Sequence, residues 1–184
     1  MKLPNLTPVL TILVATAATA QVSIMGVPDR DPATPNLDTI KKLVGDWVEL
    51  DEAGLPTDNV VSSYRVTAGG SAVLDIEFGG TDHEMLTVYH QDGDALVLTH
   101  YCVLGNQPHM RAEPGTGRDK LVFNCEGGTN FSCAVDKHMH RGEITIIDED
   151  HLTSKWYLYE KGDHVYTAEF NLVRRKEPQG NAVR

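Results

Sequence analysis

The chain has 184 residues, of which 41% are hydrophobic, 7% aromatic and 23% charged. This length fits one domain, and the composition is that of a globular protein rather than a disordered or fibrous one. Asp and Glu number 26 against 16 Lys and Arg, a net charge of −10. A nucleic-acid binder needs a basic surface to neutralise phosphates, and the only dense basic run is residues 174–176. Composition therefore excludes nucleic acid as a partner.

Residues 1–20 have the three parts of a secretory signal peptide. Lys2 precedes an apolar stretch from Val9 to Ala18, and Ala18-Thr19-Ala20 supplies the small residues of a cleavage site. The apolar stretch is about half of the ~20 residues that a membrane span needs. We therefore expect an exported protein, periplasmic or extracellular, with no membrane span.

The remaining chain divides into three parts. Residues 21–36 contain three prolines and little periodicity, which indicates an extended lead-in. Residues 37–176 form the predicted domain, and residues 177–184 a C-terminal tail. The domain is expected to open with a short helix, because Asn36 is a suitable N-cap and apolar residues follow at helical spacing until Gly45.

From residue 46 onward the hydrophobic period changes to two, which is typical of strands. The breaks are short and rich in turn residues, and Asp92-Gly93 is the clearest hairpin signal. The expected strands are 46–51, 59–67, 71–78, 83–90, 95–104, 108–113, 119–126, 139–148, 152–159 and 164–174.

Tight turns between these strands leave no room for crossover helices, so the strands should pair sequentially and antiparallel. An open sheet of this kind would expose two edges, and closure into a barrel removes them. The sequence therefore predicts an all-β fold, an up-and-down antiparallel barrel of about 8–10 strands with a short N-terminal helix. A two-sheet sandwich is the alternative, although it usually needs longer connections.

The segment Leu43-Val44-Gly45-Asp46-Trp47 resembles the Gly-x-Trp entry of lipocalins and related calycin barrels. Residues 89–108 also resemble a YH-x-DG-x-x-L…THYC…GNQP stretch of secreted bacterial lipocalin-like proteins of unassigned function. The resemblance implies that Trp47 packs across the closed end of the barrel. There it would lie near a basic residue of the last strand, Arg174 or Arg175, in a cation–π contact.

Two pairs of side chains have the spacing of metal ligands on a strand. His138-Met139-His140 places two imidazoles at i and i+2, and His100-Tyr101-Cys102 does the same with an imidazole and a thiol. Because successive strand side chains alternate faces, each pair leaves one side of its strand. If the two strands are neighbours, His100, Cys102, His138 and His140 are candidate ligands for Zn or Cu.

The faces used by these histidines depend on register. Ile144 shares parity with His138 and His140, so both should point into the barrel unless a bulge intervenes. For His100 two hairpin registers stay open. A two-residue turn at Asp92-Gly93 puts Met85, Thr87 and Tyr89 beside it, whereas a three-residue loop puts Glu84, Leu86 and His90 there.

Three cysteines leave one over after any disulfide. Cys125 and Cys133 are separated by a short loop containing two glycines, so this pairing is favoured and leaves Cys102 as a free thiol. A bond between Cys102 and Cys125 is the rival connectivity and would remove Cys102 as a ligand.

The sequence supports three classes of function. The first is a non-enzymatic binding protein that holds a small apolar or amphipathic molecule inside the barrel. The second is a barrel metalloprotein with hydrolase or lyase activity, and the third is a structural or interaction module. No nucleophile-elbow, phosphate-loop or Rossmann signature favours an enzyme, and oligomeric state stays open. The residues expected to line the ligand site are Leu98, Tyr101, Trp156, Leu158 and Phe170.

Overall fold

The computed structural model describes residues 34–116 and 119–176. The predicted signal peptide, most of the lead-in and the C-terminal tail lie outside these residues. Within the described ranges, no helix has both the length and the apolar character needed to cross a bilayer.

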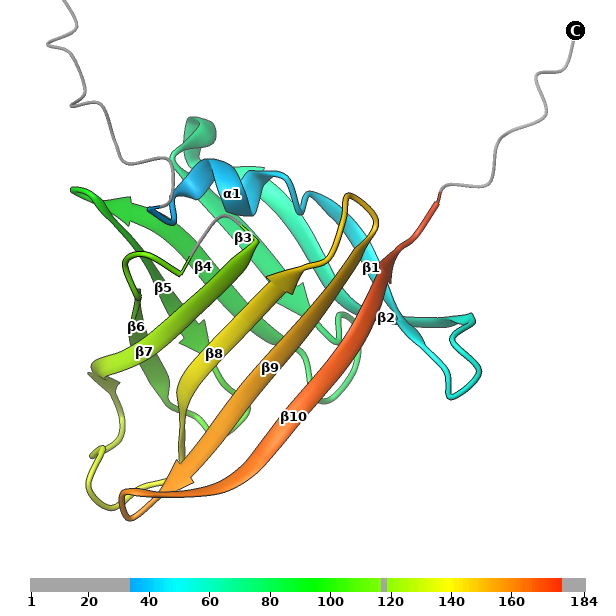
Figure 1. The fold of residues 1–184 in the computed structure, drawn as a ribbon. Coiled ribbons are helices and arrows are strands. Elements are labelled where there is room, and N and C mark those ends of the chain that lie inside the picture. The colour runs from blue at the N-terminus through cyan, green and yellow to red at the C-terminus, as the bar shows by residue number, and fades with distance from the viewer. Residues whose placement is uncertain (1–33, 117–118, 177–184) are drawn as a thin grey trace, which may run out of the picture.

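The described chain consists of one short helix followed by ten strands (Figure 1). The helix α1 spans Leu37–Lys41, and a 3-10 turn, η1, spans Ala68–Gly70. The strands are β1 (Gly45–Leu50), β2 (Pro56–Thr67), β3 (Ala72–Glu77), β4 (Met85–Asp92), β5 (Ala95–Tyr101), β6 (Gln107–Ala112), β7 (Lys120–Thr129), β8 (His138–Ile146), β9 (His151–Glu160) and β10 (Asp163–Arg174).

The ten strands form a closed antiparallel barrel in which each strand pairs with its neighbours in sequence and β1 pairs with β10. This confirms the predicted barrel over the sandwich. The β4–β5 hairpin turns at Gly93 and Asp94, with Asp92 opposite Ala95. The expected turn at Asp92-Gly93 is therefore wrong by one residue. Thr87 lies opposite His100, so the strand residues beside His100 are still those expected for a two-residue turn and not for a three-residue loop.

Helix α1 lies across one end of the barrel (Figure 1). The Asn36 side chain caps it by accepting a hydrogen bond from the amide of Thr39. Leu37 and Ile40 are buried in the main hydrophobic core, so the helix closes this end with apolar side chains. The opposite end carries the β3–β4, β5–β6 and β7–β8 loops.

Trp47 and Arg174 join the first and last strands beneath the helix. The two residues are paired in the β1–β10 ladder, and the guanidinium carbon lies 4.4 Å from the centre of the Trp47 ring. The guanidinium also donates to the backbone carbonyls of Val44, Lys42 and Glu149. The expected cation–π contact is therefore present, and Arg174 rather than Arg175 makes it.

The glycine of the Gly-x-Trp segment has a steric role in this arrangement. Gly45 has a φ of 126°, and a Cβ added there would lie 3.2 Å from Nη1 of Arg174. Glycine at this position gives the guanidinium room to reach Trp47.

Replacement of Arg174 by alanine should lower the free energy of unfolding by about 2–4 kcal/mol, because it removes the cation–π contact and hydrogen bonds to three carbonyls. Arg174→Lys keeps the charge but not the planar fork, so it should recover only part of this loss. Urea unfolding of the two variants and the wild type measures the difference. Equal stability of Arg174→Ala and wild type would contradict this account of barrel closure.

Candidate functional site

A row of polar side chains crosses four neighbouring strands inside the barrel. Tyr64 of β2 lies opposite Asp75 of β3, Asp75 lies opposite Thr87 of β4, and Thr87 lies opposite His100 of β5. All four side chains are buried. Two residues further along β3, Glu77 is buried as well. The strand register therefore gathers two carboxyl groups, two hydroxyl groups and an imidazole in the barrel interior.

Thr87 connects Glu77 to His100 by hydrogen bonds. Its hydroxyl oxygen lies 2.8 Å from Oε1 of Glu77 and 2.8 Å from Nδ1 of His100. Two atoms at the outer ends of this chain, Oε2 of Glu77 and Nε2 of His100, are buried without a hydrogen-bond partner. Buried polar atoms are normally partnered, so these two are the atoms most available to a bound molecule.

Both residues line a cavity of about 60 Å³ between the polar row and β8, β9 and β10. Apart from Ser62, Ser154, Glu77 and His100, its walls are apolar. The Trp156 ring stacks on His100 with ring centres 4.9 Å apart and forms one of these walls. The apolar lining is Val61, Phe78, Met85, Met139, Trp156, Ala168 and Phe170.

Gly142 of β8 fixes how closely Trp156 approaches the barrel wall. The two residues are paired across β8 and β9, and a Cβ on Gly142 would lie 3.1 Å from Cζ3 of the indole. A side chain there would crowd the ring, so the absence of one lets Trp156 lie against the strand.

Burial controls the protonation of the three titratable groups. Desolvation raises the pKa of Glu77 well above its usual value, and the nearby charge of Asp75 raises it further. Desolvation also raises the pKa of Asp75, to about 7. It acts in the opposite direction on His100, whose pKa falls to about 4. Burial therefore leaves the imidazole of His100 uncharged at neutral pH and favours the protonated form of Glu77.

When Glu77 and His100 are both uncharged, the direction in which the Thr87 hydroxyl donates its proton determines which atom of each residue carries a proton. When Thr87 donates to Glu77, it accepts from Nδ1–H of His100, so Nε2 is an acceptor and Oε2 of Glu77 carries the acid proton. When Thr87 instead donates to His100, Nε2 carries a proton and Oε2 of Glu77 accepts. In either arrangement the cavity offers one donor and one acceptor.

Phe78 lies at the cavity, toward the end of the barrel opposite helix α1. Its φ is 53°, a left-handed backbone conformation that is uncommon for a bulky residue. The carbonyl of Phe78 accepts hydrogen bonds from the amide and the hydroxyl of Thr81, which hold this conformation. Its ring contacts Phe170 edge to face at 5.6 Å. Strain of this kind is most often retained beside functional sites.

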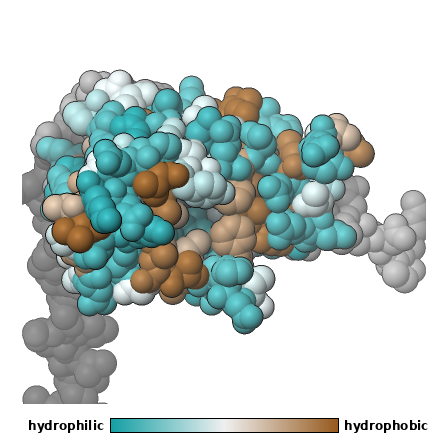
Figure 2. Space-filling model, turned by 90° about the horizontal axis from the view of Figure 1, so that it is seen from below, coloured by the Kyte–Doolittle hydropathy of each residue, from teal (hydrophilic) through white to brown (hydrophobic). Residues whose placement is uncertain are grey.

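Figure 2 views this end of the molecule and shows hydrophobic side chains in separate small groups among hydrophilic ones. The exposed apolar residues include Val103 and Leu104 of the β5–β6 turn and Val135 of the β7–β8 loop. Small separate groups are usual on a protein surface and do not by themselves indicate a docking patch.

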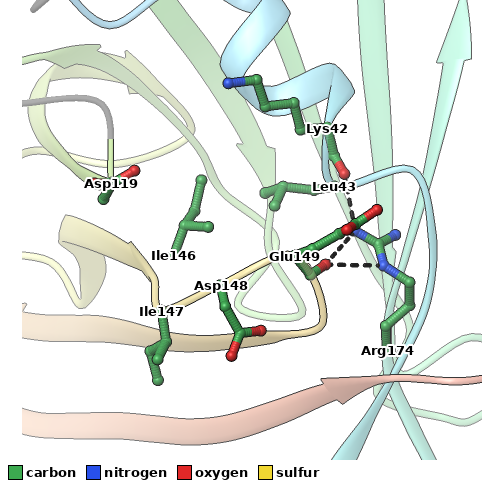
Figure 3. A pocket seen from close by; sticks show the side chains of 8 residues that line it. All are labelled: Lys42, Leu43, Asp119, Ile146, Ile147, Asp148, Glu149 and Arg174. Carbon is green, nitrogen blue, oxygen red and sulfur yellow. Dashed lines mark hydrogen bonds between the residues drawn. The ribbon is translucent and has the colours of Figure 1, made fainter.

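A larger hollow of about 740 Å³ lies at the helix end, lined in part by Lys42, Asp148 and Arg174 (Figure 3). Arg174 is engaged there with the carbonyls of Lys42 and Glu149, drawn as dashed lines. None of its lining side chains is among the buried, unpartnered polar groups of the described residues. The interior cavity is therefore the stronger candidate site.

Two of the five residues predicted to line a ligand site do line the interior cavity, and three do not. Trp156 and Phe170 line the interior cavity. Leu98 is buried in the main core, and Leu158 is half-buried, but neither lines the cavity. Tyr101 is 49% exposed, because it alternates with the inward-facing His100.

The four predicted metal ligands are not brought together. Among the described residues, no group of three drawn from His100, Cys102, His138 and His140 has ligand atoms within 4.8 Å of one another. The reason is a register shift between Met139 and Arg141 in the β8–β9 ladder. The shift places Met139 in the cavity wall together with His100. The parity of Ile144 instead predicts that His138 and His140 point into the barrel.

His138 and His140 instead belong to a second cluster at the β7–β8 connection. Nε2 of His138 lies 3.0 Å from Nδ1 of His140. One ring nitrogen of His138 and the sulfurs of Cys125 and Cys133 all lie within 4.8 Å of one another. Burial raises the pKa of the Cys125 thiol to about 11. Cys125 and Cys133, the two cysteines expected to form a disulfide, therefore lie close together but are free thiols in this structure. Cys102 is also free and is buried away from them.

Sequence reasoning missed Asp75 and Glu77. Leu74 and Ile76 suggest that the other face of β3 points inward, yet those two are half-buried while Asp75 and Glu77 are buried. The only signal is that polar residues on β2, β3, β4 and β5 fall opposite one another, and this becomes visible once the register is known.

No protein-family model matches the chain, and no curated protein matches it.

Asp75→Asn should reveal the cost of burying this carboxyl group. Its pKa is raised from 3.8 to about 7 on folding, so its proton stabilises the native state at low pH and this contribution is lost as pH rises from about 4 to about 7. The unfolding free energy of Asp75→Asn minus that of wild type should therefore increase over this range, by at most about 1.4 kcal/mol per pH unit.

Urea unfolding at several pH values measures this difference, and Asp82→Asn, at an exposed carboxyl group, is the control. A difference for Asp75→Asn that stays flat, or a slope of the same size in the control, would contradict the assignment to burial.

Proposed function

We propose that this protein is a binding protein that holds a small, neutral, amphipathic molecule in the barrel cavity. The observation that carries the proposal is the pair of unpartnered buried atoms, Oε2 of Glu77 and Nε2 of His100, in a cavity with otherwise mainly apolar walls. Leaving polar atoms buried without partners costs about 1–3 kcal/mol each. A ligand that satisfies both would recover that cost.

The two atoms define the polar end of the ligand. Because one donates and the other accepts, a hydroxyl group, a carboxylic acid or a primary amide can satisfy both at once. A charged group is disfavoured, since the cavity is desolvated and burial favours the uncharged forms of Glu77 and His100.

The walls define the remainder of the ligand. Trp156 and Phe170 provide flat apolar surfaces, and Met85 and Met139 provide flexible ones. A cavity of about 60 Å³ is far below the ~300 Å³ at which pockets for drug-sized molecules begin. The ligand class is therefore a short-chain molecule of a few heavy atoms, with methionine movement allowing modest extension.

The proposed location of the protein and its proposed family relationship rest on the sequence. The signal-like residues 1–20 support binding after export, and the Gly-x-Trp entry supports a relationship with lipocalin-like barrels. Both are part of the proposal.

Titration with butyramide and 1-butanol, followed by the NMR signal of the Trp156 indole N–H, tests the proposal. Both molecules pair a short chain with a group that donates and accepts, so each should give a saturable shift. n-Butylamine, cationic at neutral pH, should give none. Native mass spectrometry of the protein as purified then shows whether a small molecule is retained.

Two variants make the test specific. Thr87→Val breaks the link between Glu77 and His100 and should weaken binding about tenfold. Thr99 and His109 form a similar hydroxyl–imidazole pair at 2.9 Å on the exposed surface, so Thr99→Val is the matched control and should leave binding unchanged. Absence of saturable binding by either neutral probe, together with no retained molecule, would overturn the proposal.

A further inference from the structure

We propose that Cys125, Cys133, His138 and His140 form a tetrahedral Zn²⁺ site that fastens the β7–β8 loop to the end of the barrel. No part of this inference depends on ligand binding in the interior cavity, because none of the four residues lines that cavity.

The four residues come from three neighbouring places in the chain. Cys125 lies on β7, Cys133 in the loop that follows, and His138 and His140 on β8. The β7–β8 ladder ends at Asn124 opposite Arg141, so the strands separate just where these residues begin. The separation leaves side chains of both strands facing the loop between them.

The distances approach those of a coordination sphere. One nitrogen of His138 and both sulfurs lie within 4.8 Å of one another. Zn–N distances of about 2.0–2.1 Å and Zn–S distances of about 2.3 Å put tetrahedral ligand atoms roughly 3.3–3.8 Å apart. Nδ1 of His140, 3.0 Å from Nε2 of His138, supplies the fourth ligand. Small side-chain movements would bring the two sulfurs and His138 to a metal. His140 lies outside that group of three and would have to turn its ring from His138 toward the sulfurs.

His138 is already oriented as a ligand. Its Nδ1 is 2.9 Å from the carbonyl of Asp136 and donates to it, which leaves the lone pair on Nε2, the atom that faces His140. Zinc-binding histidines commonly hold their ring in this way, with the second nitrogen donating to a backbone carbonyl. The ring is fully buried and stacks on Phe131 with centres 4.6 Å apart.

The loop that carries Cys133 is held in place by several contacts. The amides of Val135 and Asp136 donate to the carbonyl of Ser132, and the Asp136 carboxylate accepts from the amide of Ser132. The buried Asn106 side chain donates to the carbonyl of Lys137 at 2.7 Å. These contacts hold Ser132, directly before Cys133, and the approach to His138.

Gly128 completes this support from β7. A Cβ there would lie 2.5 Å from the Phe131 ring and 2.2 Å from the carbonyl oxygen of Gln107. Only glycine allows Phe131 to lie against the strand and stack on His138. Glycine at this position allows the close approach of both the β6 backbone and the Phe131 ring that stacks on His138.

The ligand chemistry selects zinc. Two thiolates and two neutral imidazoles make a closed Cys₂His₂ set, which is typical of structural Zn²⁺ sites. Binding breaks the hydrogen bond between His138 and His140 and forms two Zn–S and two Zn–N bonds. The two thiol protons are released to water, and the His140 proton moves through water from Nδ1 to Nε2 of the same ring. The two thiolate charges balance the dication, so the complex as a whole is neutral and suits a partly buried position.

Metal analysis of the full-length protein, reduced and then dialysed against Zn²⁺, tests the proposal. We expect one zinc per chain, held with a dissociation constant below about 1 µM. Co²⁺ in its place should give the visible absorption of a tetrahedral site and a thiolate-to-cobalt charge-transfer band. His138→Gln and Cys133→Ser should each abolish both signals, and Cys133 is exposed, so its replacement should leave the fold intact.

Cys102→Ser and His109→Gln are the matched controls, since they change a cysteine and a histidine outside the cluster, and both should retain one zinc. His140→Gln should weaken zinc binding at least tenfold. Three outcomes would overturn the proposal: no zinc on the reduced wild type, zinc retained by Cys133→Ser, or a Cys125–Cys133 disulfide that forms in the presence of equimolar Zn²⁺.

Discussion

The pairing of the first strand with the last is the constraint on which the rest of the molecule depends. Arg174 and Trp47 lie opposite each other in that ladder and are joined by the cation–π contact. The same guanidinium holds the carbonyls of Lys42 and Val44, which follow the helix. The β1–β10 ladder closes the barrel, and the Arg174 side chain ties this ladder to the end of the helix. The interior is consequently blocked there, and the cavity lies toward the other end.

Most of the fold could be predicted from sequence because its determinants are local. Alternation of apolar and polar residues gave the ten strands, and short turns such as the one after Asp92 gave their antiparallel order. The contact between Trp47 and Arg174 followed from the Gly-x-Trp resemblance. The strand and turn signals are each contained in a few neighbouring residues, so no knowledge of register was needed for them. The contact between Trp47 and Arg174 joins the two ends of the domain and was expected only from the resemblance.

The lining of the interior could not be predicted because it depends on register at single residues. The shift between Met139 and Arg141 puts Met139 into the cavity wall instead of the histidines beside it. On β3 the more apolar face is not the buried one, since Asp75 and Glu77 point to the interior. A protein that buries carboxyl groups gives up stability, and such a loss is commonly retained where function requires it.

The contact between Gly142 and Trp156 also bears on how this barrel could diversify. The cavity is bounded by the indole, and the position of the indole is limited by a residue that does not itself line the cavity. A methyl group at position 142 would lie 3.1 Å from the indole, so the ring would have to shift and the wall of the cavity would shift with it. The shape of the cavity is therefore adjustable by a single substitution on a neighbouring strand, with every residue that lines the cavity kept unchanged.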